Sequence, residues 1–211
     1  FDIAILISPR SPRAKLGLSE HNNRGSSGQR DQCARVKTMA NLQKSVCVYC
    51  GSRDGVRPAY AWAAADTGEM LARRGWRLVY GAGDVGLMGR VASAAQKAGG
   101  KTFGVIPVHL LEMEVGKRDL DTFIITETMH ERKKVMFMNC DAVVVMPGGA
   151  GSLDELFEVV TWRQLGLHDK PIYLLNTNDY WDPLILLIKH VITQGFADAS
   201  LLDYITVVPD A

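Results

Sequence analysis

Ala142-Val143-Val144-Val145-Met146-Pro147-Gly148-Gly149-Ala150-Gly151-Ser152-Leu153-Asp154-Glu155 is the stretch that decides the fold of this 211-residue chain. A β-branched run that ends in glycines and is followed by an amphipathic segment predicts a strand, a tight turn and a helix. Its three glycines lack the Cβ atoms that would keep a ligand away from the backbone. The helix adds unpaired N–H groups and the positive end of its dipole. We therefore expect an anion such as phosphate to bind here.

A purely structural explanation exists for part of this stretch. Ser152-x-x-Glu155 before an apolar run is also a capping box, in which the two side chains satisfy backbone N–H groups at the start of a helix. A cap explains the serine and the glutamate, but a turn needs no more than one glycine. The glycines together therefore favour a ligand-binding turn over a purely structural one.

Composition indicates an ordinary globular protein with one domain. Hydrophobic residues make up 47% of the chain and charged residues 22%, which is typical of folded domains. The net charge is +1 and no Lys/Arg run occurs, so we expect no nucleic-acid partner. No apolar run approaches the roughly 18 residues that a membrane span needs, so we expect no membrane association.

Cysteine spacing offers a redox or metal hypothesis that we do not favour. Cys47-x-x-Cys50 has the spacing of a redox motif or of half a zinc site, but no second pair completes a metal site. The pair lies in a strand-like run, where buried thiols behave as small apolar residues. His109, His168 and His190 show no metal spacing either. We therefore expect no metal and a reducing compartment, the cytoplasm.

Residues 1–40 differ from the rest of the chain. They contain polar, basic stretches without periodicity, which bury too little apolar surface to offset the entropy of ordering. Residues 1–7 are apolar but lack the basic start and the small-residue cleavage site of a signal peptide. We expect a disordered or non-native extension, a natural start at Met39, and one folded domain over residues 41–211.

From residue 45 onward, strand-like and helix-like segments alternate. Strands are expected at 46–50, 76–80, 102–106, 123–126, 142–146, 172–176 and 207–208. Helices are expected at 58–74, 87–98, 129–139, 152–165 and 181–194. The intervals fit βαβ units, and several strands are apolar throughout, as in sheets covered on both faces. The sequence thus predicts a Rossmann-like, doubly wound parallel sheet in a single α/β domain.

Glycine or serine turns follow three of these strands, at Gly51-Ser52, Gly81–Gly86 and Gly148–Gly151. In a doubly wound sheet, ligands bind beyond the carboxyl ends of the strands, so the three turns can converge on one ligand. Gly81-x-Gly83-x-x-Gly86 has the spacing of a dinucleotide fingerprint, but it follows the second strand, and no acidic residue ends the third. We therefore expect no nicotinamide cofactor.

Three motifs occur in order along the chain: Tyr80–Gly89, Met129–Lys133 and Pro147–Glu155. Together they make it resemble the LOG ("lonely guy") family of cytokinin riboside 5′-monophosphate phosphoribohydrolases, often labelled lysine-decarboxylase-like. The resemblance covers about residues 45–208. The family pattern is PGGxGTxxE; this chain has Ser152 where threonine is usual, and Ala82 where many members have glycine. A decarboxylase would need a lysine-bound pyridoxal phosphate site, which the sequence does not show, so we expect no cofactor.

The resemblance implies hydrolysis of the N-glycosidic bond of a nucleoside 5′-monophosphate to a free base and ribose 5-phosphate. The substrate would be a cytokinin riboside monophosphate, AMP or both. Glu155 would stabilise the oxocarbenium-like charge on the ribose, and Arg132 would donate to the departing base. The other residues expected to contact substrate are Ser52, Gly83, Met129, Lys133, Gly148, Gly149, Gly151, Ser152 and Glu158. The alternative is a non-catalytic nucleotide-binding or carrier module on the same scaffold.

Other residues near these motifs are expected to be structural. Asp154 would be a first-turn charge that favours the helix dipole, and His130 a solvated surface residue. Trp162 lies on a helix that, by resemblance, packs at a dimer interface. The apolar face of residues 156–165 predicts at least a homodimer. Core positions, rather than ligand contacts, are expected for Trp62, Met136 and Met138.

Overall fold

The computed structural model of the chain describes residues 43–111 and 116–209. Its strands are β1 Ser45–Tyr49, β2 Arg77–Tyr80, β3 Thr102–Pro107, β4 Thr122–Thr126, β5 Ala142–Val145, β6 Ile172–Leu175 and β7 Ile205–Val208. Its α-helices are α3 Pro58–Arg73, α4 Gly86–Lys97, α5 Val108–Leu111, α6 Met129–Met138, α7 Ala150–Gln164 and α8 Asp182–Thr193. Two 3₁₀ helices are η1 Thr177–Asp179 and η2 Ala199–Tyr204. The extension expected at residues 1–40 and the start expected at Met39 lie outside the described residues.

The strands form one sheet in the order β4-β3-β2-β1-β5-β6-β7, and every neighbouring pair is parallel. From β1 the chain builds outward through β2, β3 and β4, and then returns to place β5, β6 and β7 on the other side. The order therefore reverses between β1 and β5, which is the position where doubly wound sheets bind ligands. The predicted Rossmann-like, doubly wound α/β fold is confirmed.

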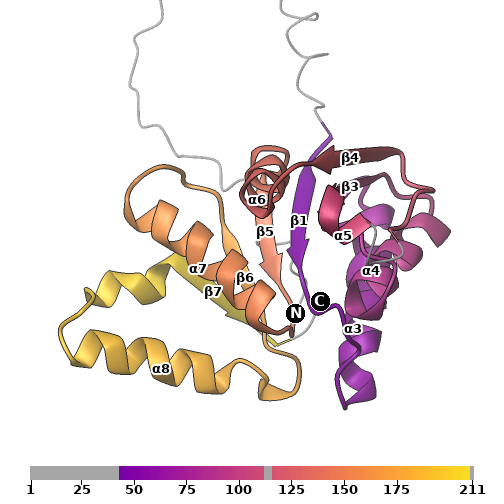
Figure 1. Cartoon of the computed structure of the whole chain (residues 1–211). Coiled ribbons are helices and arrows are strands. Elements are labelled where there is room, and N and C mark those ends of the chain that lie inside the picture. Colours follow the sequence, from indigo (N-terminus) through magenta and orange to yellow (C-terminus); the bar gives the residue numbers. More distant parts are fainter. Residues whose placement is uncertain (1–42, 112–115, 210–211) are drawn as a thin grey trace, which may run out of the picture.

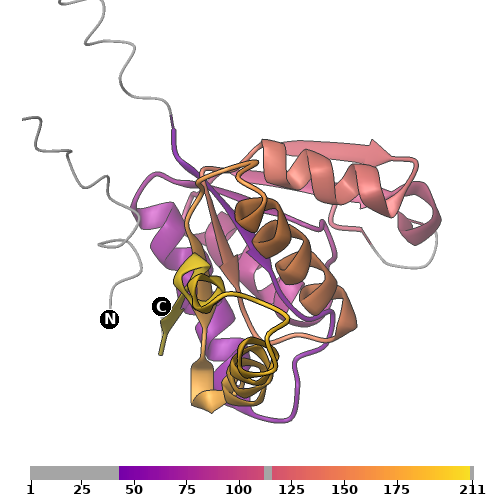
Figure 2. The same ribbon diagram turned by 90° about the vertical axis from the view of Figure 1, so that its left-hand side faces the viewer.

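Helices cover both faces of the sheet (Figures 1 and 2). α3 and α4 pack on one face, and α6, α7 and α8 cover the other. Side chains of β1 alternate between the two cores: Val46 and Val48 point into the first, Cys47 and Tyr49 into the second. All four side chains are at most 1% exposed, which explains why the strand is apolar throughout.

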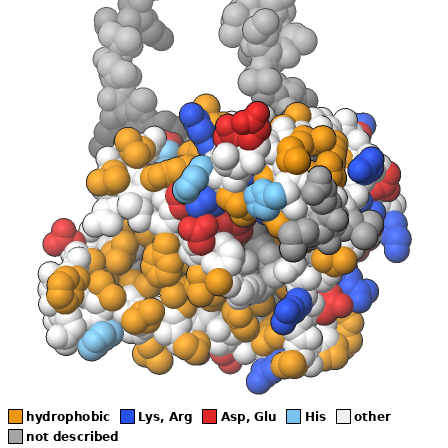
Figure 3. Space-filling view, in the orientation of Figure 1, with side chains coloured by type: hydrophobic (Ala, Val, Ile, Leu, Met, Phe, Trp, Pro, Cys, Tyr) orange, Lys and Arg blue, Asp and Glu red, His pale blue; other side chains and the backbone are white. Residues whose placement is uncertain are grey.

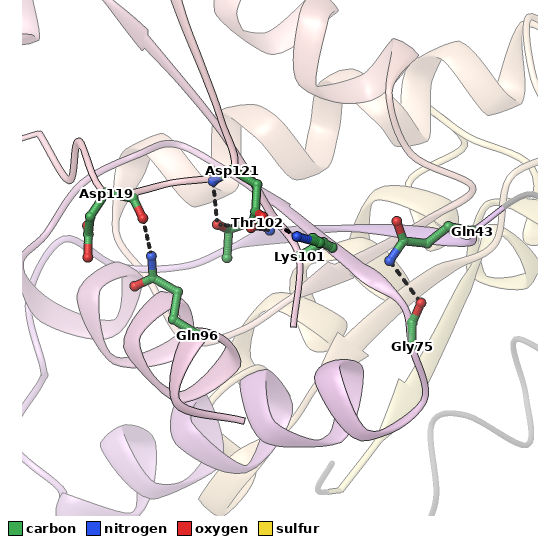
Figure 4. Close-up of polar contacts among 7 residues, drawn as sticks. All are labelled: Gln43, Gly75, Gln96, Lys101, Thr102, Asp119 and Asp121. Carbon is green, nitrogen blue, oxygen red and sulfur yellow. Dashed lines mark hydrogen bonds and ion pairs between the residues drawn. The ribbon is translucent and has the colours of Figure 1, made fainter. Parts of the chain in front are cut away.

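Polar contacts fix the amino-terminal ends of β3 and β4 (Figure 4). The Asp121 carboxylate accepts hydrogen bonds from the Thr102 backbone N–H at 2.9 Å and from the Lys101 ammonium at 2.6 Å. These bonds, that of Lys101 above all, lower the pKa of Asp121. The Gln96 side chain donates to the Asp119 carbonyl at 2.6 Å, which ties the end of α4 to the same loop. This network lies at the amino-terminal ends of the strands, opposite to the carboxyl ends where ligands are expected to bind.

Every predicted strand and helix is present, and each boundary lies within two residues of the predicted one. The short elements α5, η1 and η2 were not predicted, because they are too short to show a hydrophobic period. The third strand, predicted to end at residue 106 before Pro107, extends one residue further: Pro107 is the last residue of β3 and pairs with Thr126.

Two residues expected in the core are on the surface. Trp62 is 67% exposed and Met138 is 68% exposed, so the core prediction for both is wrong. The buried face of α3 is formed instead by residues such as Ala63, Ala64 and Leu71, and Trp62 lies outside this stripe. Met136, in contrast, is 1% exposed as expected, but it also lines a cavity, so the expectation that it is remote from any ligand is not met. His130 is exposed as expected.

Cys47, Cys50 and Cys140 are free, buried thiols in the described part of the chain, which agrees with the apolar role expected for Cys47 and Cys50. Burial raises the pKa of Cys47 and of Cys50, so both remain protonated. Within residues 43–111 and 116–209, no group of three or more His, Cys, Asp or Glu side chains is placed to hold a metal ion. In the same ranges, no helix has the length and apolarity that a membrane crossing requires.

Candidate active site

The candidate active site lies where the order of the strands reverses. The turns after β1 and β5 are joined by a hydrogen bond from the Gly51 N–H to the Pro147 carbonyl at 3.0 Å. The start of α4 is attached to the same place, because the Leu87 N–H donates to the Gly51 carbonyl at 3.1 Å. The glycine and serine turns that the sequence placed at three strand ends therefore meet at one edge of the sheet.

Helix α7 begins directly at the glycine turn. Gly149 is its N-cap, and no side chain caps the first backbone N–H groups. Because the helix starts at Ala150, Ser152 and Glu155 both lie inside it, and the capping box that offered a purely structural explanation of these two residues is absent. The Ser152 side chain is buried and lies against Gly148, where an added Cβ atom would overlap its Oγ. Gly148 is thus a glycine for packing reasons.

Gly149 and Gly151 have no such packing reason. A Cβ atom built at either position would meet no atom within 4 Å, and neither residue has a positive φ. Neither packing nor backbone conformation therefore demands glycine at these two positions. Bare backbone beside an uncapped helix N-terminus leaves N–H groups and space for an anionic ligand. The geometry supports the phosphate-binding interpretation of the turn.

A cavity of about 250 Å³ opens beside this turn. It brings together seven of the predicted site residues: Ser52, Met129, Arg132, Gly149, Gly151, Ser152 and Glu155. Residues that were not predicted also line it: Val48, Tyr49, Cys50, Gly51, Gly81, Met88, Met136, Ala150 and Asp154.

Four predicted residues do not line this cavity. Gly148 lines a neighbouring cavity of about 420 Å³, which shares Gly51, Ser52 and Gly149 with the first. Gly83 forms an isolated antiparallel bridge with Gly116. The other two, Lys133 and Glu158, form an ion pair with each other.

Arg132 is held by two backbone carbonyls, one within β3 and one directly after the neighbouring strand β2. It is 6% exposed; its Nε donates to the Val105 carbonyl at 3.1 Å and its Nη2 to the Gly81 carbonyl at 2.8 Å. A Cβ atom on Gly81 would overlap the guanidinium, so a side chain there would displace Arg132 from this position. Because a guanidinium has more N–H donors than these carbonyls use, others are available to a ligand in the cavity that Arg132 lines.

Helix α6 presents Met129, Arg132 and Met136 to the cavity, because spacings of three and four residues lie on one helical face. The start of α6 is fixed by a capping box that was not predicted from the sequence. The Glu131 N–H donates to the Thr128 hydroxyl oxygen at 3.1 Å, and the Thr128 N–H donates to the Glu131 carboxylate at 3.2 Å. The Thr-x-x-Glu pattern before Arg132 was the available signal.

Lys133 is buried and paired with two carboxylates. Its Nζ lies 2.9 Å from Asp154 Oδ2 and 3.2 Å from Glu158 Oε1. Burial alone lowers the pKa of Lys133, but the two carboxylates outweigh it and raise the pKa, so the ammonium stays charged. Asp154 is therefore an ion-pair partner. The prediction that it is a first-turn charge is wrong, because α7 has no acidic residue in its first turn.

Glu155 lines the cavity together with Arg132. Its removal from water raises the pKa of its carboxyl group from 4.5 to about 7. The positive charges of Arg132 and Lys133 oppose this rise, and the negative charges of Asp154 and Glu158 add to it. Both protonated and ionised forms are populated near neutral pH, so Glu155 can accept and return a proton there.

Comparison with known proteins identifies one family. Residues 88–211 match the family model described as "Possible lysine decarboxylase". The chain is 42% identical over 168 residues to the cytokinin riboside 5′-monophosphate phosphoribohydrolase LOG5 of Arabidopsis thaliana, covering 80% of this chain and 74% of that protein. It is 43% identical over 157 residues to the probable enzyme LOG4 of Oryza sativa subsp. japonica, covering 74% and 68%.

Solved structures share the fold. The molybdenum cofactor binding protein from Rippkaea orientalis superposes with a TM-score of 0.60 at 20% identity, covering 81% of this chain and 92% of that one. The Moco carrier protein from Chlamydomonas reinhardtii gives a TM-score of 0.60 at 22% identity, covering 80% and 91%. At such identities the likeness shows the fold alone. The sequence matches, in contrast, identify the family: this chain belongs to the LOG family of cytokinin riboside 5′-monophosphate phosphoribohydrolases.

Proposed function

We propose that this chain hydrolyses the N-glycosidic bond of a nucleoside 5′-monophosphate and releases a free base and ribose 5-phosphate. The names of its relatives support this reaction class. The observation that carries the proposal is the cavity in which Glu155 and Arg132 lie together beside the uncapped start of α7. A phosphate site alone would need the glycine turn but neither of these two side chains.

The 5′-phosphate binds at the glycine turn and the first N–H groups of α7 in this mechanism. Gly149, Gly151 and Ser152 line the cavity at this end, and backbone N–H groups together with the helix dipole favour a dianion. Binding energy from the phosphate then holds the ribose in place at Glu155. The phosphate therefore serves to position the bond that breaks.

The reaction develops opposite charges on the two fragments. As the bond between C1′ and the base nitrogen breaks, its electron pair goes to the base and the ribose becomes oxocarbenium-like. The ionised Glu155 carboxylate stabilises that positive charge and accepts a proton from the water whose oxygen bonds to C1′. Arg132 donates to the base and stabilises its negative charge until the base takes up a proton; a guanidinium remains charged and is not the proton source.

Apolar side chains would contact the base of the substrate. Met88, Met129 and Met136 line the same cavity, and methionine side chains adapt to irregular shapes and contact aromatic rings favourably. We propose that these side chains accept adenine with or without an N6 substituent. Both AMP and a cytokinin riboside monophosphate are therefore proposed substrates.

Chromatography of the reaction products tests this proposal against the carrier alternative. The chain is incubated with AMP and, separately, with isopentenyladenosine monophosphate, and free base and ribose 5-phosphate are measured. We expect both products from the native chain, and formation of both slowed by roughly 10²-fold or more in the Glu155→Gln variant. A chain that binds either nucleotide and returns it intact would be a carrier, and the hydrolase proposal would be wrong.

We further propose at least a homodimer, without nucleic-acid or membrane partners, in a cytoplasmic compartment. Apolar side chains gather over the region of α7 and α8 in Figure 3, and Phe157, Leu165 and Leu167 are 40%, 67% and 68% exposed. The exposed apolar face of α7 is nevertheless narrower than the sequence predicted. Leu156, Val159 and Val160, which were expected on that face, are buried in the protein's own core. The free thiols support a reducing compartment. A monomer by light scattering at micromolar concentration would contradict the dimer.

A further inference from the structure

The loop after β6 contacts the phosphate turn from outside the active-site cavity. The Tyr180 hydroxyl donates a hydrogen bond to the Gly148 carbonyl at 2.7 Å. Tyr180 lines the neighbouring cavity of about 420 Å³ and is not among the residues that line the active-site cavity. Its ring makes edge contacts with Tyr60, at 5.5 Å between ring centroids, and with Trp181, at 4.8 Å. These two contacts restrain the ring on one side, while Tyr180 is 37% exposed.

This loop has a strained backbone that its surroundings support. Asn178 and Asp179 are consecutive non-glycine residues with φ values of 53° and 57°, in the left-handed region. Such strain persists where neighbouring contacts fix the conformation, and it is concentrated at functional sites. Here the Asn176 side chain accepts a hydrogen bond from the Trp181 N–H at 2.6 Å and donates one to the Asp182 carboxylate at 2.8 Å. These contacts hold the loop in the conformation that brings the tyrosine to the turn.

The hydrogen bond fixes the orientation of one peptide unit. The peptide between Gly148 and Gly149 has a glycine on each side and therefore little conformational restraint of its own. The described residues contain no cis peptide bond, and in a trans peptide the C=O and N–H groups point in opposite directions. Because the Gly148 carbonyl points to Tyr180, the Gly149 N–H points away from it. Gly149 lines both cavities, whereas Tyr180 lines only the outer one, so an N–H that points away from Tyr180 is available on the active-site side.

We propose that Tyr180 is a positioning residue for the substrate phosphate. Its hydroxyl holds the Gly148–Gly149 peptide so that the Gly149 N–H is directed at the anion. This inference rests on the proposed function for the identity of the ligand, a phosphate monoester. Without the hydroxyl, the peptide between the two glycines loses the bond that fixes its carbonyl, and its N–H is turned away from the phosphate in part of the population.

Tyr180→Phe tests the proposal, because it removes the hydroxyl and keeps the ring. Tyr60→Phe is the matched control: it removes a hydroxyl from the same aromatic pair and the same cavity without touching Gly148. Calorimetry with ribose 5-phosphate and with inorganic phosphate gives the affinity, and a melting curve verifies folding. We expect Tyr180→Phe to bind both probes roughly tenfold more weakly, as for a lost charge-assisted hydrogen bond, and Tyr60→Phe to bind them as the native chain does.

Kinetics and labelling give independent readouts. In Tyr180→Phe, KM for AMP should rise by the same factor as the phosphate affinity falls, whereas cleavage of adenosine, which has no phosphate, should not change. In a chain labelled with ¹⁵N-glycine, the Gly149 amide proton should shift on addition of phosphate in the native chain and shift less in the variant. These effects separate orientation of the peptide from general damage to the fold.

Unchanged phosphate affinity in a folded Tyr180→Phe variant would overturn the proposal. An equal loss in Tyr60→Phe would also overturn it, because the effect would then come from the aromatic pair rather than from the Gly148 hydrogen bond. A native chain that binds phosphate but releases no base from AMP would refute the proposed hydrolysis. The phosphate comparison between the two variants would still decide the role of Tyr180 in that case.

Discussion

Glu155→Gln is expected to lower activity and to raise stability at the same time. A pKa raised from 4.5 to about 7 means that the ionised carboxylate is about 3 kcal/mol less stable in the folded chain than in the unfolded chain. Glutamine keeps the size of the side chain and removes the charge. The substitution therefore removes an electrostatic penalty from the folded state together with the charge that the transition state uses.

The sign of the stability effect depends on pH. Below pH about 4.5 the carboxyl group is protonated in both the folded and the unfolded chain, and no penalty exists. As the pH rises through 4.5 to about 7, the unfolded chain ionises first, so the native chain loses stability relative to the variant. Above pH about 7 the full penalty applies. The variant should thus have the higher free energy of unfolding at pH 8, by up to about 3 kcal/mol, and no advantage at pH 4.

Two measurements test this pair of effects. Steady-state hydrolysis of AMP should show kcat lowered by roughly 10²-fold or more, because the lost interaction is made mainly in the transition state. Calorimetric melting at pH 8 should show a Tm several degrees higher, at about 2–4 °C per kcal/mol for a chain of this size. Glu69→Gln, an exposed carboxylate paired with Arg73 on α3, is the control and should change neither quantity noticeably. Native kcat with an unshifted melt would refute the reasoning.

Three further results are expected. For AMP hydrolysis, kcat/KM should rise with pH through about 7 as Glu155 ionises and then level off; a flat profile between about pH 5 and 9 would contradict this role. Gly81→Ala should lower kcat at least about tenfold, because the new Cβ displaces the Arg132 guanidinium from the Gly81 carbonyl; native kcat in the folded variant would show that this placement is not needed. Adenosine should be cleaved with a lower kcat and a higher KM than AMP, because it lacks the group bound at the turn; equal turnover of the two would rule out a role for the phosphate.

Local sequence patterns predicted the fold and the centre of the site. The apolar run into Gly148 and Gly149 predicted β5 and its turn, and the alternation of strands and helices predicted the parallel sheet. The reversal of strand order next to β1 then explains why turns distant in the sequence share one cavity. Strands, helices and glycine turns can be recognised in a sequence because their patterns depend only on residues that are close together in the chain.

What the sequence did not predict depends on contacts between distant segments. Arg132 is held by carbonyls of Gly81 and Val105, which no local pattern links to α6. The start of α7 at Ala150 follows from the geometry of the whole glycine turn, whereas the Ser-x-x-Glu pattern pointed to a later start. Trp62 was assigned to the core by residue type, although its place on α3 decides its exposure.

Simultaneous quantification of free adenine and ribose 5-phosphate formed from AMP tests the central claim most directly. Hydrolysis at C1′ predicts that the native chain forms the two products in equal amounts, that the amounts grow with time, and that Glu155→Gln forms both roughly 10²-fold more slowly or slower still. If calorimetry shows that AMP binds to the native chain and the nucleotide is recovered intact after prolonged incubation, Glu155 and Arg132 do not form a hydrolytic site.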